Sequence, residues 1–123
     1  MNLKSKTTIG LIAAGSLVVG LTVAQPAQAG SNLCPSSMVC LYEDQSYVAL
    51  LGYLSGGQPL HNVSSGANDK MSSWENKSSH DGAWFDDANA SGTCHNMFAL
   101  SESPWVGLSS NDKLTSWRTN AHC

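Results

Sequence analysis

The sequence has few charged residues and no cluster of positive charge. Only 12% of its 123 residues are charged, with six Lys and Arg against nine Asp and Glu. Proteins that bind nucleic acid or anionic lipid use clustered basic residues, which this chain lacks. The composition therefore argues against nucleic acid and against a membrane surface as partners.

Motifs of hydrolytic enzymes and of zinc sites are also absent. The chain has neither a Gly-x-Ser-x-Gly nor a His-Glu-x-x-His motif. The Cys-His pairs at 94–95 and 122–123 do not have zinc-finger spacing, and exported cysteines usually oxidise. Asp86 and Asp87 are adjacent, so on a strand they would face opposite ways and would not form an acid/base pair. We expect a protein that is not an enzyme.

Residues 1–29 have the pattern of a secretory signal peptide. Lys4 and Lys6 precede an apolar run over residues 9–24, and the segment ends in Ala-Gln-Ala, a small-x-small cleavage site. A retained membrane anchor is the weaker alternative, because the run is shorter than the roughly 20 residues that span a bilayer. We expect a secreted, extracellular chain that begins at Gly30. Loss of the two lysines lowers the net charge from −3 to −5.

The exported part, residues 30–123, allows one small domain with a modest core, which needs covalent support. Its four cysteines predict two disulfides in an oxidising compartment. Three pairings are open from the sequence. We favour Cys34 with Cys40, because the Pro-Ser-Ser turn between them brings them close, which leaves Cys94 with Cys123.

The exported part predicts an all-β fold. Strand-like runs occur at residues 39–42, 47–51, 83–85, 97–100 and 105–108. Turn-forming residues separate them, and no window keeps an apolar face at helical spacing for three turns. Many short strands with long turns indicate a Greek-key sandwich.

One motif occurs twice. Residues 68–74 read Asn-Asp-Lys-Met-Ser-Ser-Trp, and residues 111–117 read Asn-Asp-Lys-Leu-Thr-Ser-Trp. An aromatic residue followed by two acids, at 42–44 and 85–87, repeats at the same spacing of 43 residues. A shared spacing indicates a structural repeat of about forty residues.

The two repeats cover about residues 38–80 and 81–123. Each is expected to supply one four-stranded Greek key, and the two keys to pack about a pseudo-twofold axis. No linker separates them, so we expect a single domain.

The repeated motif offers oxygen ligands. Side chains of Asn, Asp, Ser and Thr, together with turn carbonyls, are hard oxygen donors that suit calcium better than zinc or copper. One copy would indicate only a turn, because these side chains often bond their own backbone. A second copy in register favours calcium binding, with a duplicated turn that binds no metal as the alternative.

These motifs resemble those of the βγ-crystallin superfamily of two-Greek-key domains. In that superfamily the early turn normally reads aromatic, four residues, aromatic, one residue, Gly. Here the first copy, residues 42–49, has Ala49 in place of Gly, and the second, residues 85–92, has Ala90 in place of the second aromatic residue. The later signatures are intact in both repeats. The resemblance implies a βγ-crystallin-like sandwich of two Greek keys, linked by disulfides.

The resemblance also implies which residues would hold about two calcium ions. The side chains would be Asn68, Asp69 and Ser72 in one clamp, and Asn111, Asp112 and Thr115 in the other. Main-chain carbonyls near Glu43 and Asp86 would complete the sites. The superfamily tends to share ligands between motifs, so the assignment of each hydroxyl to an ion stays open.

Two further residues of each signature have structural roles in this interpretation. We expect Ser73 and Ser116 to bond the backbone of the fold. We expect Trp74 and Trp117 to pack in its core.

The start of the exported chain resembles a narrower group. Residues 34–44, Cys-Pro-Ser-Ser-Met-Val-Cys-Leu-Tyr-Glu-Asp, and residues 84–89 are similar to secreted bacterial proteins of peptidase inhibitor family thirty-six. Its best-known members inhibit metalloproteinases, which implies a secreted protease as partner. Their inhibitory loop does not carry over, because a short second disulfide closes it, whereas Cys94 and Cys123 lie 29 positions apart.

The leading hypothesis is therefore a monomeric, calcium-binding peptidase inhibitor that presents a rigid loop to a protease cleft. Residues 75–82, expected to be exposed, or residues 101–104 could form that loop. The alternatives are a calcium-stabilised structural or stress protein and a killer-toxin-like secreted antimicrobial binder. Fold alone does not distinguish them, because function depends on the site.

Overall fold

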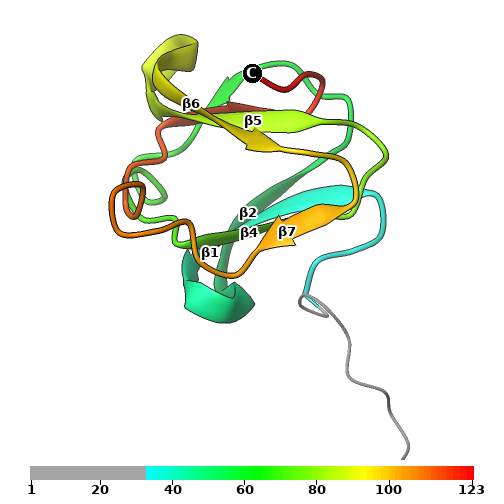
Figure 1. The fold of residues 1–123 in the computed structure, drawn as a ribbon, viewed down its shortest axis with the longest axis horizontal. Helices are drawn as coiled ribbons and strands as arrows, with labels where there is room; N and C mark the ends of the chain where they lie inside the picture. The colour runs from blue at the N-terminus through cyan, green and yellow to red at the C-terminus, as the bar shows by residue number, and fades with distance from the viewer. Residues whose placement is uncertain (1–32) are drawn as a thin grey trace, which may run out of the picture.

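The computed structural model describes residues 33–123, which form two four-stranded antiparallel sheets packed face to face (Figure 1). The strand order is β2-β1-β4-β7 in the first sheet and β3-β8-β5-β6 in the second. The all-β class and the Greek-key sandwich are confirmed. The predicted signal peptide lies outside the described residues, and none of the helices within 33–123 is long and apolar enough to cross a membrane.

The first sheet contains β1 (Met38–Asp44), β2 (Val48–Ser55), β4 (Ser73–Asn76) and β7 (Ser101–Ser103). The second contains β3 (His61–Asn62), β5 (Gly82–Asp87), β6 (Ser91–Met97) and β8 (Ser116–Arg118). Two short 3-10 turns, η2 (Gln45–Tyr47) and η3 (Ala88–Ala90), connect β1 to β2 and β5 to β6.

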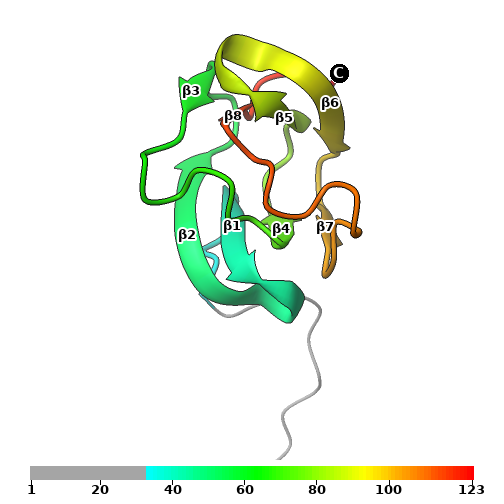
Figure 2. The same cartoon turned by 90° about the vertical axis from the view of Figure 1, so that its left-hand side faces the viewer.

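The two repeats exchange one strand each. The first repeat supplies β1 to β4 and the second supplies β5 to β8, but the third strand of each repeat joins the other sheet. β7 pairs with β4 of the first repeat, and β3 pairs with β8 of the second. Figure 2 shows both crossings. Each sheet therefore depends on strands from both repeats.

Two of the predicted strands are wrong. Within residues 97–100 only Met97 belongs to a strand, and residues 98–100 form a turn between β6 and β7. Residues 105–108 lie in a loop. Both runs are apolar, yet Leu100 and Leu108 are 75% and 86% exposed. The prediction assumed that apolar runs are buried strands, and these two runs carry exposed leucines in loops.

The core lies between the sheets. Three tryptophans dominate it, and Trp74 and Trp117 occupy it as predicted. Burial of each such side chain contributes roughly 1.5–3 kcal/mol. The buried residues of the core are Val39, Leu41, Met71, Trp74, Trp84, Met97, Leu114 and Trp117.

Both predicted disulfides are confirmed. Cys34–Cys40 packs with Tyr42 in a small cluster on the outer face of the first sheet. Cys94–Cys123 ties the C-terminal segment to β6. The chain-entropy model gives about 2.4 kcal/mol for the short loop and about 3.6 kcal/mol for the long one.

The second residue of β2 and the second residue of β6 are left-handed. Ala49 has φ 65° and Gly92, at the equivalent position, has φ 76°. An L-residue pays roughly 1–2 kcal/mol for this conformation, so the first repeat carries strain that the second avoids. A Cβ on Gly92 would also lie 2.6 Å from Asp87 Oδ2. The hairpins keep the same fold although each lacks one residue of the superfamily pattern.

Substitutions at the two positions should have opposite effects. Ala49→Gly is expected to raise the free energy of unfolding by up to about 1 kcal/mol, because relief of strain exceeds the added chain entropy of glycine. Gly92→Ala is expected to lower it by about 1–3 kcal/mol through strain and the contact with Asp87. Chemical unfolding in chelator would measure both changes. A shift in the same direction for both variants would contradict this explanation.

Candidate functional site

The two repeated signatures meet at one end of the sandwich. Their loops lie at the left of Figure 1, where the green and orange segments approach each other. Asp69 and Asp112 line one open depression of about 410 Å³, together with Asp86 and Asp87. Lys113 is the basic residue at its wall. The fold therefore gathers acidic residues from the early turn of the second repeat and from both signatures.

A hydroxyl of each signature approaches the other signature. Ser72 Oγ donates a hydrogen bond to Asn111 Oδ1 at 2.5 Å. Thr115 Oγ1 lies 3.5 Å from Asp69 Oδ1. Each contact joins a hydroxyl of one repeat to an amide or carboxylate oxygen of the other. The oxygen atoms are thus grouped across the repeats and not within one signature.

The backbone holds the two signatures in matching positions. Asp69 and Asp112 have φ 59° and 60°, a conformation that Asp tolerates better than most residues. The amide of Asp69 donates to the carbonyl of Leu114 at 2.9 Å, and the amide of Asp112 donates to that of Met71 at 3.1 Å. Both acceptor residues have fully buried side chains. The core therefore fixes the backbone of both turns.

Further bonds attach each signature to the early turn of its own repeat. Ser72 N donates to Tyr42 O at 2.9 Å, and Thr115 N donates to Phe85 O at 3.0 Å. These bonds place the signatures beside the residues that follow, Glu43 and Asp86, whose neighbourhood the sequence indicated for the carbonyl ligands.

The serine before the tryptophan in each signature, Ser73 and Ser116, is structural, as predicted. Ser73 Oγ donates to Asp44 O at 2.6 Å and accepts from Tyr47 N at 3.1 Å. In the second repeat, Ser116 Oγ makes the same two bonds, again at 2.6 and 3.1 Å, with Asp87 O and Ala90 N. Both serines are fully buried.

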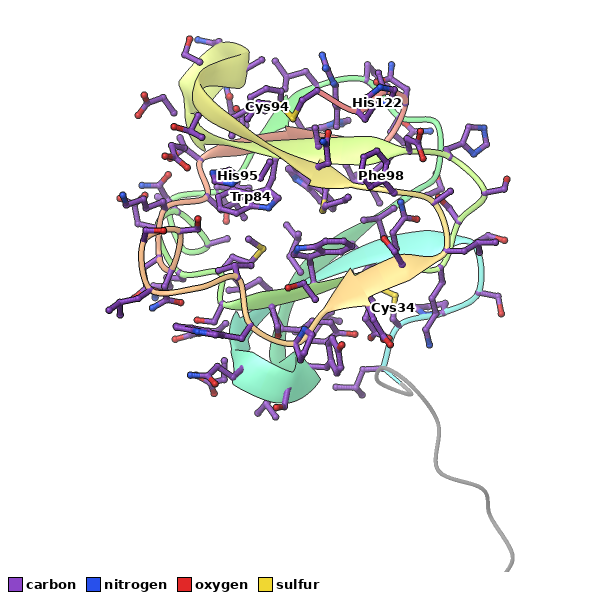
Figure 3. The ribbon with its side chains drawn as sticks, viewed as in Figure 1. Cys34, Trp84, Cys94, His95, Phe98 and His122 are labelled. Atoms are coloured by element: carbon purple, nitrogen blue, oxygen red, sulfur yellow. A yellow bond between two sulfur atoms is a disulfide. The ribbon has the colours of Figure 1, made fainter. Side chains whose placement is uncertain are left out.

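Asp86 has a partner that the sequence did not indicate. His95 Nε2 lies 2.8 Å from Asp86 Oδ1, and the imidazole stacks on Trp84 with ring centroids 3.8 Å apart (Figure 3). These contacts hold the Asp86 carboxylate against β6. Nothing in the sequence brings residue 86 to residue 95 except the β5–β6 hairpin.

Carboxylates and imidazoles alone do not form a metal site here. Among residues 33–123, no three or more His, Cys, Asp or Glu side chains group closely enough to hold an ion. A cation at the depression would therefore also need amide, hydroxyl or main-chain oxygens. Those donors suit calcium, and Ser72, Asn111, Asp69 and Thr115 already present them in contact.

The pKa of one tyrosine, Tyr47, on the outer face of the first sheet departs from its ordinary value. Burial, and then the neighbouring Glu102, raises the pKa of Tyr47 to about 12. Tyr47 stays protonated at physiological pH. The same face buries Glu75, whose Oε1 accepts a hydrogen bond from the Tyr42 hydroxyl at 2.6 Å.

Most of residues 75–82, which were predicted to be exposed, are buried or half-buried, and within this stretch Ser79 and His80 are exposed. Glu75, Asn76 and Ser78 are at most 2% exposed. Asn76 Oδ1 accepts bonds from the amide and the hydroxyl of Ser78, at 2.9 and 2.7 Å, so polar side chains are buried because they organise the turn. The other candidate, residues 101–104, consists mostly of β7 and is half-buried except at Pro104.

A different loop, residues 98–100 between β6 and β7, exposes apolar side chains. Phe98 is 50% exposed and Leu100 is 75% exposed. Leu100 has φ 57°, which is a strained conformation for a bulky side chain. The loop lies at the right of Figure 3, where Phe98 and His122 are labelled, at the opposite end from the acidic depression.

Four hydrogen bonds fix the backbone around this loop. Asn76 Nδ2 donates to Met97 O at 2.8 Å, and Ser101 Oγ donates to Phe98 O at 2.6 Å. The amide of Ala99 donates to Asp81 Oδ1 at 2.9 Å, and the amide of Leu100 donates to Ser78 O at 3.1 Å. The loop is therefore ordered before it meets any partner.

A family model described as peptidase inhibitor family I36 matches residues 27–97. The chain belongs to this family. A search of curated proteins found no significant match. Membership of family I36 and the crystallin fold both describe non-catalytic proteins, in agreement with the expectation that this is not an enzyme.

Solved βγ-crystallin domains support the same fold for this I36 protein. A domain from Clostridium beijerinckii is 29% identical, with TM-score 0.53, over 65% of this chain and 93% of that one. A clostrillin double mutant in complex with nickel is 26% identical, with TM-score 0.56, over 70% and 100%. A domain from Flavobacterium johnsoniae, at 23% identity and TM-score 0.53, covers 68% and 92% and supports the fold alone.

The structural role of Ser73 and Ser116 can be measured directly. Ser73→Ala and Ser116→Ala are each expected to lower the free energy of unfolding by about 1–3 kcal/mol, because each removes a fully buried hydroxyl that bonds one amide and one carbonyl of the early turn. Urea unfolding in chelator would give the values. Ser109→Ala, at an exposed serine in a loop, is the control and should change stability by less than about 0.5 kcal/mol. Equal effects at all three positions would contradict the assignment.

Proposed function

We propose that this protein is a secreted peptidase inhibitor whose fold is stabilised by about two calcium ions. The observation that supports calcium is the approach of hydroxyl and carboxamide or carboxylate oxygens across the repeats, at Ser72–Asn111 and Thr115–Asp69. The observation that supports inhibition is the ordered apolar loop 98–100 in a chain of family I36.

In this proposal the calcium ligands come from both repeats. Asn68, Asp69, Ser72, Asn111, Asp112 and Thr115 supply side-chain oxygens, and main-chain carbonyls near Glu43 and Asp86 complete the sites. An ion bound there neutralises carboxylates that otherwise repel one another and joins loops from the two repeats. Bound calcium therefore favours the folded chain by mass action.

Calcium should bind at about two sites with dissociation constants of about 10⁻⁴ to 10⁻³ M, typical of extracellular modules. At one hundred times the dissociation constant it should add about 2.7 kcal/mol to the free energy of unfolding. Asp69→Ala with Asp112→Ala should weaken binding at least tenfold and abolish most of the stabilisation. Isothermal calorimetry and thermal unfolding, each with and without chelator, would measure both effects.

Two control variants separate specific ligands from general charge. Glu43→Gln removes one exposed carboxylate near the site but keeps the main-chain carbonyl, so binding should stay within about threefold. Asp81→Asn removes one carboxylate at the opposite end of the molecule. Unchanged affinity in the Asp69 and Asp112 double variant, or equal losses in all variants, would contradict the clamp assignment and leave the signatures as structural turns.

The proposal of inhibition depends on the preorganised backbone of loop 98–100. A peptidase cleft accepts an extended segment whose side chains enter specificity pockets, and an already ordered loop loses little entropy on binding. Phe98 and Leu100 are apolar, and the bonds to Met97, Phe98, Ala99 and Leu100 fix their backbone. We therefore propose a target with apolar specificity pockets, among secreted metalloproteinases or serine proteinases.

Loop variants should test this contact. Phe98→Ala and Leu100→Ala are expected to raise the inhibition constant against a susceptible peptidase at least tenfold, with little change in melting temperature. Leu108→Ala, at another exposed leucine, is the control and should inhibit like the parent protein. Inhibition constants would be measured against a panel of secreted peptidases with apolar specificity.

Failure of the parent protein to slow any peptidase in that panel would overturn the inhibitor proposal without affecting the calcium proposal, because the two sites lie at opposite ends of the molecule. Calcium binding without inhibition would favour the calcium-stabilised structural or stress protein. Toxicity toward competing microorganisms would favour the killer-toxin-like alternative.

A further inference from the structure

The sandwich has four edge strands, and three have features that discourage pairing with another chain. β3 is two residues long, and β7 is three residues long and includes Glu102. β6 is longer, but Cys94–Cys123 holds the C-terminal segment beside it, where Cys123 N donates to Asn96 Oδ1 at 2.7 Å. Short, charged or covered edges are common ways to prevent sheet-to-sheet association.

β2 lacks these protections. It is the longest edge strand, with eight residues, and it contains no charged side chain. Val48, Leu50 and Tyr53, here called the β2 row, are 53%, 37% and 52% exposed. An uncharged edge with exposed apolar side chains is the kind of edge that recruits another strand.

The β2 row lies on the outer face of the first sheet. Leu50 and Tyr53 pair across the ladder with Tyr42 and Cys40, which belong to the cluster outside the sandwich core. Cross-strand partners project to the same side of a sheet. The side chains of the row therefore point away from the core and stand next to one another along one edge.

Charge favours a second copy of this chain as the partner. The chain is acidic, yet residues 45–68 contain no Asp, Glu, Lys or Arg. Two copies that met at the acidic depression would bring Asp69, Asp86, Asp87 and Asp112 of each together. Two copies that met at β2 would avoid that repulsion. A neutral edge also gives no charge by which a different partner would be selected.

We propose that β2 pairs antiparallel with β2 of a second copy and forms a twofold-symmetric dimer with one continuous sheet of eight strands. Main-chain amides and carbonyls on the free side of β2 would supply the hydrogen bonds. The contact is isologous, because each copy contributes the same strand, β2, to the interface. The two β2 rows lie on the same face of the joined sheet and pack against each other. The proposal departs from the monomer expected from the sequence.

A register shift in the β1–β2 ladder limits the interface. Leu41 pairs with Gly52 and Tyr42 with Leu50, so Leu51 is an extra residue at a bulge. Bulges bend a strand and interrupt regular pairing. Regular pairing is therefore confined to residues 52–55, and we expect a weak, reversible dimer with a dissociation constant of about 10 µM to 1 mM.

Sedimentation velocity in chelator tests the proposal independently of calcium and of any peptidase. The protein would be produced with its leader, purified after export and measured from about 10 µM to 1 mM, the range set by the expected affinity. The sedimentation coefficient should rise from that of a monomer to that of a dimer. Amide hydrogen exchange within residues 52–55 should slow at high concentration.

Matched lysine variants locate the contact. Tyr53→Lys should weaken association at least tenfold, because it brings two like charges together near the twofold axis. Leu50→Lys should also weaken association, because it places a charge in the β2 row where the two copies pack against each other. Leu108→Lys adds the same charge at an exposed leucine outside β2 and should dimerise like the parent. Melting temperatures would show that each variant is folded.

Three outcomes would overturn the proposal. The first is a monomer at every concentration. The second is equal weakening by Leu108→Lys, which would place the contact elsewhere. The third is a chain that stays monomeric alone but holds a different protein at β2.

Discussion

The exchange of β3 and β7 between the two sheets is the constraint on which the rest of the molecule depends. Because each repeat gives its third strand to the opposite sheet, neither sheet is complete without the other repeat. The chain after β6 must also cross from the second sheet to the first within three residues. That short crossing produces the exposed loop 98–100. The same interlocking brings the two signatures together, so that Ser72 contacts Asn111.

Much of the fold could be predicted because it depends on residues close in sequence and on an internal repeat. The repeat spacing located the two Greek keys, and the short loop between Cys34 and Cys40 indicated the disulfide pairing. Buried serines and tryptophans of the signatures could be assigned because each has one role in a known turn. These features depend on neighbours in sequence or on an exact internal repeat, which a single sequence shows.

The features that could not be predicted depend on partners distant in sequence. β4, β7 and β8 are short and mostly polar, and pairing with neighbouring strands defines them, with no apolar alternation to indicate them. Asn76 and Ser78 have a polar sequence typical of exposed turns, but they are buried because they bond each other and the 97–100 crossing. The contact of His95 with Asp86 requires the β5–β6 register. Sequence indicated the clamp residues but not their contacts across the repeats.

The acidic depression and the loop 98–100 lie at opposite ends of the sandwich, and β6 runs from Gly92 and Thr93 at the depression to Met97 before the loop. Calcium at the depression would therefore act on the loop by stabilising the whole fold, without direct contact. Such an arrangement lets a small domain present an apolar loop without relying on that loop for stability. The loop instead depends on buried groups beneath it, above all Asn76 and Ser78.

The position of the last residues has a practical consequence. Cys123 is bonded through its sulfur to Cys94, and the ring of His122 lies 5.8 Å from that of Phe98 (Figure 3). A purification tag or fusion partner attached after Cys123 would leave the molecule beside the loop and obstruct anything that approaches Phe98. Immobilisation for binding measurements should therefore avoid the C-terminal side of the domain.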